Sequence, residues 1–168
     1  TAYNMSPAPR PGHQRVAGEI FRQIANLLLD KACQVFSVPF DVRFPPDDQA
    51  GDEATDTVVQ PDTSVICDRG KIDDRGCVGP PDLVVEVLSE ETGGRDEGTK
   101  FKLYEKHAVR EYWIVNPWDE TVRIYTLNHE GRYQFPICVA RPQTADSTVI
   151  KGLSVNLSDV FPSENEDG

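Results

Sequence analysis

Apolar residues recur at helical spacing near the start of the chain, in the segment HQRVAGEIFRQIANLLLDKA. The positions that share one helical face are Val16, Ile20, Ile24, Leu27 and Leu28. The pattern predicts an amphipathic helix over residues 13–32. Because a helix with one apolar face must bury that face, we expect this one to pack on a β-sheet.

Strand patterns fill much of the remaining chain. The segments with strand character are CQVFSVPFDVRF, VVQPDTSVICD, DLVVEVL, REYWIVNP, ETVRIYTL and RYQFPICV. The last two are joined through NHEG, which predicts a hairpin. GRDEGTKFKLYEKHAV is helical in its later part, and NLSDVF predicts a short helical turn. This order predicts an α/β domain with a mixed β-sheet flanked by helices.

Length and composition indicate one ordinary globular domain. The chain has 168 residues, of which 38% are hydrophobic and 27% charged, so residues 1–168 are expected to share a single core. No apolar run approaches the roughly 20 residues that span a bilayer, and the first residues lack the order of a secretory signal. We therefore predict a cytoplasmic protein without membrane contact, whose acidic end at residues 162–168 is frayed.

The cysteines and the net charge narrow the possible functions. Cys33, Cys67, Cys77 and Cys138 lie far apart without zinc-like spacing, so we expect four reduced thiols. The net charge is −11 and the isoelectric point is near 4.6. Most of such a surface repels polyanions, and a general nucleic-acid-binding protein would instead present a basic face.

Glu86 is the first candidate for chemistry, because it interrupts an apolar strand in PPDLVVEVLSEET. A carboxylate buried there is costly unless it is paired, protonated or bound to a metal. Asp82 shares its strand face but lies roughly 13 Å away, which excludes joint chelation of one ion. Asp62, in the neighbouring strand candidate, is the better partner, because adjacent strands can bring two carboxylates to one hard divalent cation.

A positive group is also expected at a site that acts on phosphate. The helix that follows Glu86 offers Lys100, which falls between Leu103 and Tyr104 near the apolar stripe. Lys100 is therefore the lysine predicted to face the sheet.

Several consecutive motifs resemble those of the Uma-two family, restriction-endonuclease-like proteins within the PD-(D/E)XK nuclease superfamily. The motifs are NMSPAPRPGHQRVAGEI, VQPDTSVICD, PPDLVVEVLSEET, GRDEGTKFKLYEKHAVREYWIVNP and GLSVNLSDVF, and together they cover nearly the whole chain. The resemblance implies a restriction-endonuclease-like core with the active site on its sheet. It assigns Asp62 to the first acidic motif and Glu86 to the second.

The chain departs from the superfamily pattern in two places. The lysine expected two positions after Glu86 is replaced by Leu88, and a lysine moved to the following helix, Lys100, fits the missing role. The chain also resembles a family member that lacks a short N-terminal segment. Glu19 resembles a helix-borne glutamate that sometimes supports metal binding in the superfamily, although it could equally be a surface residue between Arg15 and Arg22.

Structural explanations exist for the same residues. Glu86 could pair with Arg43 or Arg123, and Asp62 could simply begin a strand after Pro61. Asp82 is more typical of a turn after Pro80 and Pro81 than of a ligand. His13 could serve as a general base, but a histidine at a helix start is more often part of the cap region.

These observations predict a metal-dependent endonuclease in which Asp62 and Glu86 bind Mg²⁺ or Mn²⁺ and Lys100 assists the hydrolysis of a phosphodiester, most plausibly in DNA. DNA binding should be weak and metal-assisted, through a local cluster of basic residues. The residues of that cluster are Arg10, Arg15, Arg69, Lys71 and Arg75. The alternative is a non-catalytic binding or assembly module that retains the fold and could form a homodimer by burying the hairpin at residues 121–139.

Overall fold

Two parallel strands and the helix between them form the centre of the computed structural model. Strands β7 (Leu83–Val87) and β8 (Glu111–Asn116) run parallel, and α2 (Gly93–Lys106) makes the crossover that a parallel pair requires. The structure describes residues 10–46, 56–90 and 93–163, with side chains from residue 97 onward in α2. The frayed end predicted at 162–168 lies mostly outside these residues.

The central sheet is mixed and has the strand order β1-β4-β7-β8-β9-β10. Every neighbouring pair in it is antiparallel except β7 and β8. Its other strands are β1 (Gln34–Ser37), β4 (Thr63–Ile66), β9 (Thr121–Thr126) and β10 (Ile137–Ala140). The predicted hairpin of the last two strands is confirmed.

Smaller elements surround this sheet. The strands β3 (Thr57–Val59), β2 (Val42–Phe44), β6 (Gly76–Val78) and β5 (Ile72–Asp73) form a four-stranded sheet in that order, and η1 (Arg69–Lys71) precedes β5. A two-stranded sheet joins β11 (Thr144–Asp146) to β12 (Ser154–Asn156), and α3 (Leu157–Val160) follows as the predicted helical turn.

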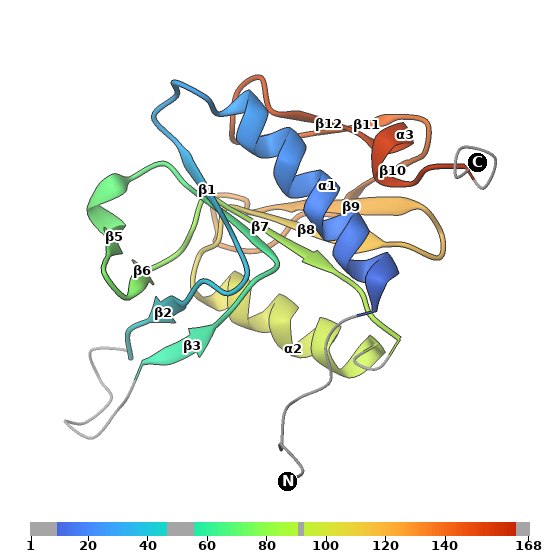
Figure 1. The fold of residues 1–168 in the computed structure, drawn as a ribbon. Helices are drawn as coiled ribbons and strands as arrows, with labels where there is room; N and C mark the ends of the chain where they lie inside the picture. Colours follow the sequence, from blue (N-terminus) through green and yellow to red (C-terminus); the bar gives the residue numbers. More distant parts are fainter. Residues whose placement is uncertain (1–9, 47–55, 91–92, 164–168) are drawn as a thin grey trace, which may run out of the picture.

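Alternate residues of the central strands contact different helices. One face carries Leu83, Val85 and Val87 and packs in one cluster with Val16, Ile20 and Ile24 of α1 (Pro11–Leu27). The other face carries Val84, Tyr112 and Ile114 and packs with Tyr104 of α2. The sheet is thus flanked by helices, as predicted, and Figure 1 shows α1 and α2 on different sides of it. Glu86, two residues after Val84, points to the α2 side.

Prolines divide two of the predicted strands. The first ends at Ser37 before Pro39 and resumes as β2, while the second is split into β3 and β4 around Pro61. Proline cannot donate a ladder hydrogen bond, so continuous pairing stops at these residues. The predicted first helix begins two residues earlier and ends five residues earlier than expected, at Pro11 and Leu27. None of the helices in the described ranges is both long and apolar enough to cross a membrane.

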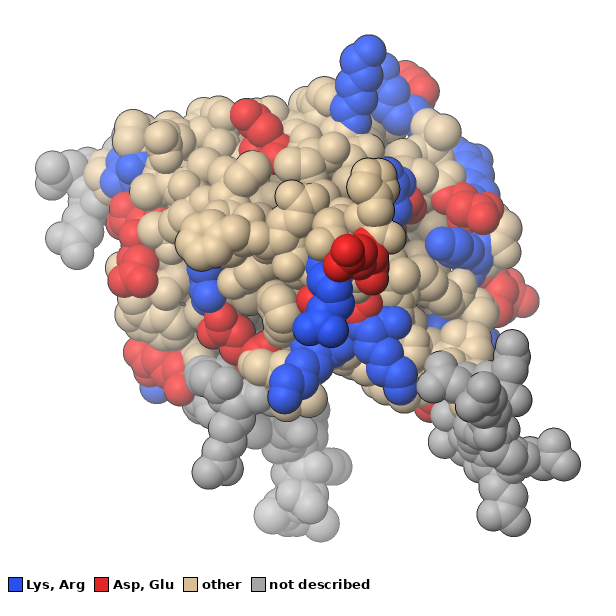
Figure 2. Space-filling view, turned by 180° about the vertical axis from the view of Figure 1, so that it is seen from behind, with Lys and Arg blue, Asp and Glu red and all other residues tan. Residues whose placement is uncertain are grey.

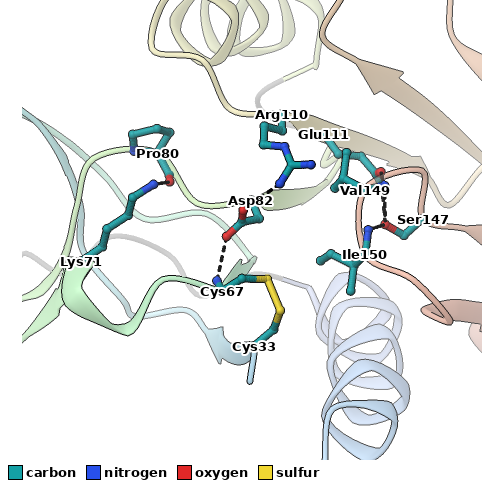
Figure 3. Close-up of polar contacts among 10 residues, drawn as sticks. All are labelled: Cys33, Cys67, Lys71, Pro80, Asp82, Arg110, Glu111, Ser147, Val149 and Ile150. Carbon is teal, nitrogen blue, oxygen red and sulfur yellow. Dashed lines mark hydrogen bonds and ion pairs between the residues drawn. A yellow bond between two sulfur atoms is a disulfide. The ribbon is translucent and has the colours of Figure 1, made fainter. Parts of the chain in front are cut away.

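The prediction of four reduced thiols was wrong for two cysteines. Cys33 and Cys67 form a disulfide, whereas Cys77 is a buried thiol and Cys138 an exposed one. Cys33 precedes β1 and Cys67 follows β4, so the antiparallel pairing of these strands brings them together. Asp82 accepts a hydrogen bond from the Cys67 amide beside the disulfide (Figure 3). Spacing along the sequence, 34 residues, gave no sign of this pairing.

Breaking this disulfide should lower the free energy of unfolding by about 3 kcal/mol, because the bond restricts a long loop of the unfolded chain. Urea denaturation with and without dithiothreitol measures the difference. The doubly substituted protein, Cys33→Ser with Cys67→Ser, is the control and should not respond to the reductant. Equal stability of the wild type in both conditions would show that the disulfide contributes nothing.

Candidate active site

Asp62 and Glu86 meet at the edge where β4 begins and β7 ends. The antiparallel register pairs Thr63 with Val85, so the next positions outward bring Asp62 opposite Glu86. The Asp62 amide donates to Oε1 of Glu86 at 3.1 Å, and the Val87 amide donates to Oδ2 of Asp62 at 2.8 Å. Each carboxylate is therefore held by the backbone of the other strand. The structure brings together the two acidic residues that the sequence paired.

Burial gives Glu86 an unusual proton affinity. Its side chain is only 6% exposed, against 18% for Asp62. Loss of solvent raises the pKa of Glu86 to about 7, with the charge of Asp62 acting in the same direction and the nearby Lys100 ammonium acting against it. The carboxyl group therefore changes between its protonated and ionised forms near neutral pH. A cation bound beside it would favour the ionised form.

Lys100 reaches the site from α2. Its Nζ donates to Oε2 of Glu86 and forms an ion pair with that carboxylate. The predicted inward orientation is thus what the structure shows. The two arginines considered as structural partners of Glu86 are engaged elsewhere, Arg43 with Asp73 and Arg123 with Glu97. The buried charge therefore has a lysine partner that is itself 38% exposed.

His13 also belongs to this group, although the sequence favoured a histidine of the cap region over a general base at this position. Its Nε2 lies 3.0 Å from the carbonyl oxygen of Val87 and 3.6 Å from Oδ2 of Asp62. The neighbouring Asp62 carboxylate raises the pKa of His13, against the opposing effect of burial. A signal was available in the sequence, because His13 precedes Val16 and Ile20 at spacings of three and seven and so shares the buried face of the helix.

Two buried hydroxyl groups lie on the same side of the sheet. The hydroxyls of Tyr104 and Ser64 have no hydrogen-bond partner within the described residues. Burial, followed by the negative charges of Glu86 and others, raises the pKa of Tyr104, so this phenol stays neutral. An uncharged donor is thus available in the interior close to the acidic pair.

Other residues considered from the sequence lie away from the pair. Glu19 forms an ion pair with Arg22 and also accepts from Gln23, which in turn contacts Asn156. Asp82 accepts from the Cys67 amide and pairs with Arg110, in keeping with the structural role expected of it (Figure 3).

The five basic residues considered for DNA binding fall into two groups. Arg10 and Arg15 lie at the start of α1, whereas Arg69, Lys71 and Arg75 lie on or near η1, β5 and β6, at the other side of the molecule (Figure 1). Arg10 is also paired with Glu90 at 2.6 Å. Figure 2 shows one face of the molecule, on which acidic side chains are interspersed among the basic ones.

The donor set suits a hard divalent cation. Mg²⁺ is commonly held by one or two carboxylates, with water and substrate phosphate completing its shell. Asp62 and Glu86 supply the two carboxylates, and the Val87 carbonyl lies beside them at His13. No cluster of three or more His, Cys, Asp or Glu residues suited to a metal occurs in the part of the chain that the structure describes. The residues present therefore fit Mg²⁺ or Mn²⁺, which keep water ligands, better than a metal whose ligands all come from the protein.

Two known proteins resemble this chain. An uncharacterised protein of Synechocystis sp., slr1290, is 29% identical over 99 residues, which cover 58% of this chain and 50% of the relative. The matched segment thus spans about half the length of that curated relative. A crystal structure described as "a putative nuclease belonging to DUF820", from Anabaena variabilis, superposes with a TM-score of 0.70 at 18% identity and covers 94% of this chain and 84% of its own.

The structural likeness establishes a fold shared with that Anabaena protein, an α/β architecture with mixed sheets. The sequence resemblance stated above is confirmed independently, since residues 1–158 match the Uma2 (Uma-two) family, whose description is "Putative restriction endonuclease". This match extends over far more than half of the chain. The protein therefore belongs to the Uma2 family of restriction-endonuclease-like proteins.

Proposed function

We propose that the protein is an endonuclease that requires Mg²⁺ or Mn²⁺ and hydrolyses phosphodiester bonds in DNA. The observation that carries this proposal is the meeting of Asp62 and Glu86 from neighbouring strands with Lys100 on the same carboxylate. Membership of a family described as restriction endonucleases supports the reaction class. The identity of the metal and of the nucleic acid belongs to the proposal.

Each residue of the group has a distinct part in the proposed reaction. Asp62 and Glu86 would hold the cation, and a bound divalent cation supplies a Lewis acid for the phosphate and lowers the pKa of a water molecule. Lys100 places a positive charge beside Glu86, where it would stabilise the negative charge that develops on the phosphate. His13 fixes the Val87 carbonyl and lies next to Asp62, so it would act through these groups as a positioning residue.

A binding or assembly module is the second candidate function. The observation in its favour is that Lys100 pairs with the buried Glu86, as it would in a protein that does no chemistry. The net charge of −11 also disfavours tight binding of DNA. This candidate predicts that the protein neither binds Mn²⁺ at the acidic pair nor cleaves DNA.

Cleavage of supercoiled plasmid and of labelled single-stranded DNA, with Mg²⁺, with Mn²⁺ and with EDTA, tests the proposal. We expect cleavage that depends on the cation and is lost in Asp62→Asn. The binding module would be favoured if the protein binds DNA but cleaves it with neither cation, and if Asp62→Asn binds DNA as the wild type does.

Lys100→Ala should leave Mn²⁺ affinity nearly unchanged above pH 8 and reduce turnover at saturating metal by at least about tenfold, because its charge is assigned to the transition state. The pH matters because loss of this cation removes an influence that lowers the pKa of Glu86. Calorimetric Mn²⁺ titration and single-turnover cleavage separate the two effects. Lys106→Ala, on the last turn of the same helix, is the matched control. A variant with normal turnover would remove Lys100 from the mechanism.

A further inference from the structure

An open pocket of about 560 Å³ lies between the central sheet and the β5–β6 hairpin. It is lined by residues of three segments that are far apart in sequence. The residues that the argument uses are Phe36, Phe40, Asp41, Gln60, Asp74 and Arg75. Its volume falls within the range of ordinary small-ligand sites. None of these residues takes part in the acidic pair described above.

The pocket adjoins the candidate active site on the same side of the sheet. Phe36 pairs in register with Ser64 of β4, and Asp62 lies two residues earlier, a rise of ~7 Å along the strand. Phe36 and Phe40 pack on the α2-side cluster that contains Val84, and Glu86 follows Val84 on that face. A group in the pocket would thus be a neighbour of a phosphate held at Asp62 and Glu86.

Two stacked aromatic rings form one wall of the pocket. The rings of Phe36 and Phe40 are parallel within 4° at a centroid separation of 4.2 Å. A parallel pair leaves flat ring faces on its outer sides, onto which a third planar ring can stack, whereas an edge-to-face pair would present hydrogens. Both side chains are only half-buried, so the wall is accessible from the pocket.

Among the polar side chains around this wall, carboxylate acceptors outnumber the donors. Gln60 donates its amide to Oδ1 of Asp41 at 2.7 Å, which uses one of the two oxygens of that carboxylate. Asp73 is neutralised by Arg43, whereas Asp74 is exposed at the rim beside Arg75. Carboxylates at these positions repel a phosphate but accept N–H groups from a neutral ring.

The acidic rim has a fixed shape. The carbonyl oxygen of Asp41 accepts a hydrogen bond from the Cys77 amide at 2.8 Å, and a Cβ at Gly76 would lie 2.2 Å from that oxygen. Gly76 has a φ of +120°, which other residues rarely adopt. The close approach therefore requires glycine and keeps Asp41 next to β6.

We propose that this pocket binds one unpaired, amino-bearing nucleobase of the strand whose phosphodiester is cut at Asp62 and Glu86. This inference rests on the proposed function, because cleavage at Asp62 and Glu86 determines which nucleotide of the strand lies at the pocket. The base stacks on the phenylalanine wall, and its amino group donates to Asp41 or Asp74. Adenine, cytosine and guanine carry such an amino group, whereas thymine has none and offers only its N3–H between two carbonyl oxygens, which the carboxylates repel.

Nucleosides test the pocket without involving the metal or the phosphate. Deoxyadenosine, deoxycytidine and thymidine are titrated in EDTA, and the upfield ring-current shifts of the base protons report stacking. We expect the amino-bearing nucleosides to bind at least about fivefold tighter than thymidine. Phe40→Leu, which keeps an apolar contact with the core, should weaken their binding about tenfold by removing the ring face. Phe135→Leu, at a phenylalanine that is 96% exposed and outside the pocket, is the matched control.

Asp74→Asn provides a second variant at an exposed position, where folding is not at risk. It should reduce the preference over thymidine while the ring-current shifts persist. Equal binding of thymidine by the wild type, full binding by a folded Phe40→Leu protein, or binding of putrescine in place of nucleosides would overturn the inference. Because Glu86→Gln should still bind nucleosides, a protein that binds them without cleaving DNA would refute the proposed function alone.

Discussion

Replacing Glu86 with Gln should reduce Mn²⁺ affinity by more than the roughly 100-fold that follows the loss of an outer-shell partner, and cleavage should fall with it. The reason is that one of the two carboxylates that the described residues bring to the site is removed. The metal-free variant should be at least as stable as the wild type. Glutamine retains an oxygen for the Asp62 amide, and the repulsion between the two acidic groups disappears. Calorimetric Mn²⁺ titration and thermal melts in EDTA measure both effects.

A surface substitution controls for the loss of one negative charge. Glu130→Gln lies in the exposed turn between β9 and β10 and should bind Mn²⁺ like the wild type. A purely structural ion pair between Glu86 and Lys100 predicts the opposite result. Breaking such a buried pair typically costs about 3 to 5 kcal/mol, so Glu86→Gln would then be strongly destabilised and the wild type would not bind Mn²⁺.

The stability of the metal-free protein should fall as the pH rises through neutrality. The pKa of Glu86 is about 7 in the folded protein, against its usual 4.5. A raised pKa means that the folded state binds the proton more tightly, so the contribution to stability is complete below pH 4.5 and is lost as the pH passes 7. The full difference is on the order of 3 kcal/mol. The raised pKa of His13 acts in the same direction.

Metal binding should show the reverse dependence on pH. A cation requires the ionised carboxylate, so Mn²⁺ affinity should increase by about tenfold for each pH unit between pH 5 and 7 and then level off. Binding near pH 7 should also release protons, which calorimetry in buffers of different ionisation enthalpy detects. Glu86→Gln should remove most of the pH dependence of the stability of the metal-free protein. A wild-type melting temperature that is constant from pH 5 to 8 would contradict the assigned pKa.

The layered fold could be predicted because its strongest signals are local. The apolar stripe of Val16, Ile20 and Ile24 predicts a helix that covers a sheet, and the β-branched run around Glu86 predicts a buried strand. The small sheet of β11 and β12 was not predicted. Its strands have three residues each, too few to show a period-two pattern.

The candidate site was predicted where its residues stand out against their surroundings. A carboxylate within an apolar strand is conspicuous, which identified Glu86 and then Asp62 in the neighbouring strand. For His13 the sequence favoured the cap over a general base, because a polar residue at a helix start has a common local explanation and its contact with Val87 spans 74 residues. A different long-range contact, the pairing of β1 with β4, brings Cys33 and Cys67 together in a disulfide, which no spacing rule predicts.

A crystal structure of the wild type grown with Mn²⁺, with anomalous scattering recorded at the manganese edge, tests whether Asp62 and Glu86 form a metal site. We predict an anomalous peak in contact with carboxylate oxygens of both residues, absent from crystals of Glu86→Gln grown in the same solution. A map without a peak at this position, in which Lys100 still pairs with Glu86 at saturating Mn²⁺, would contradict the assignment of this acidic pair to metal binding.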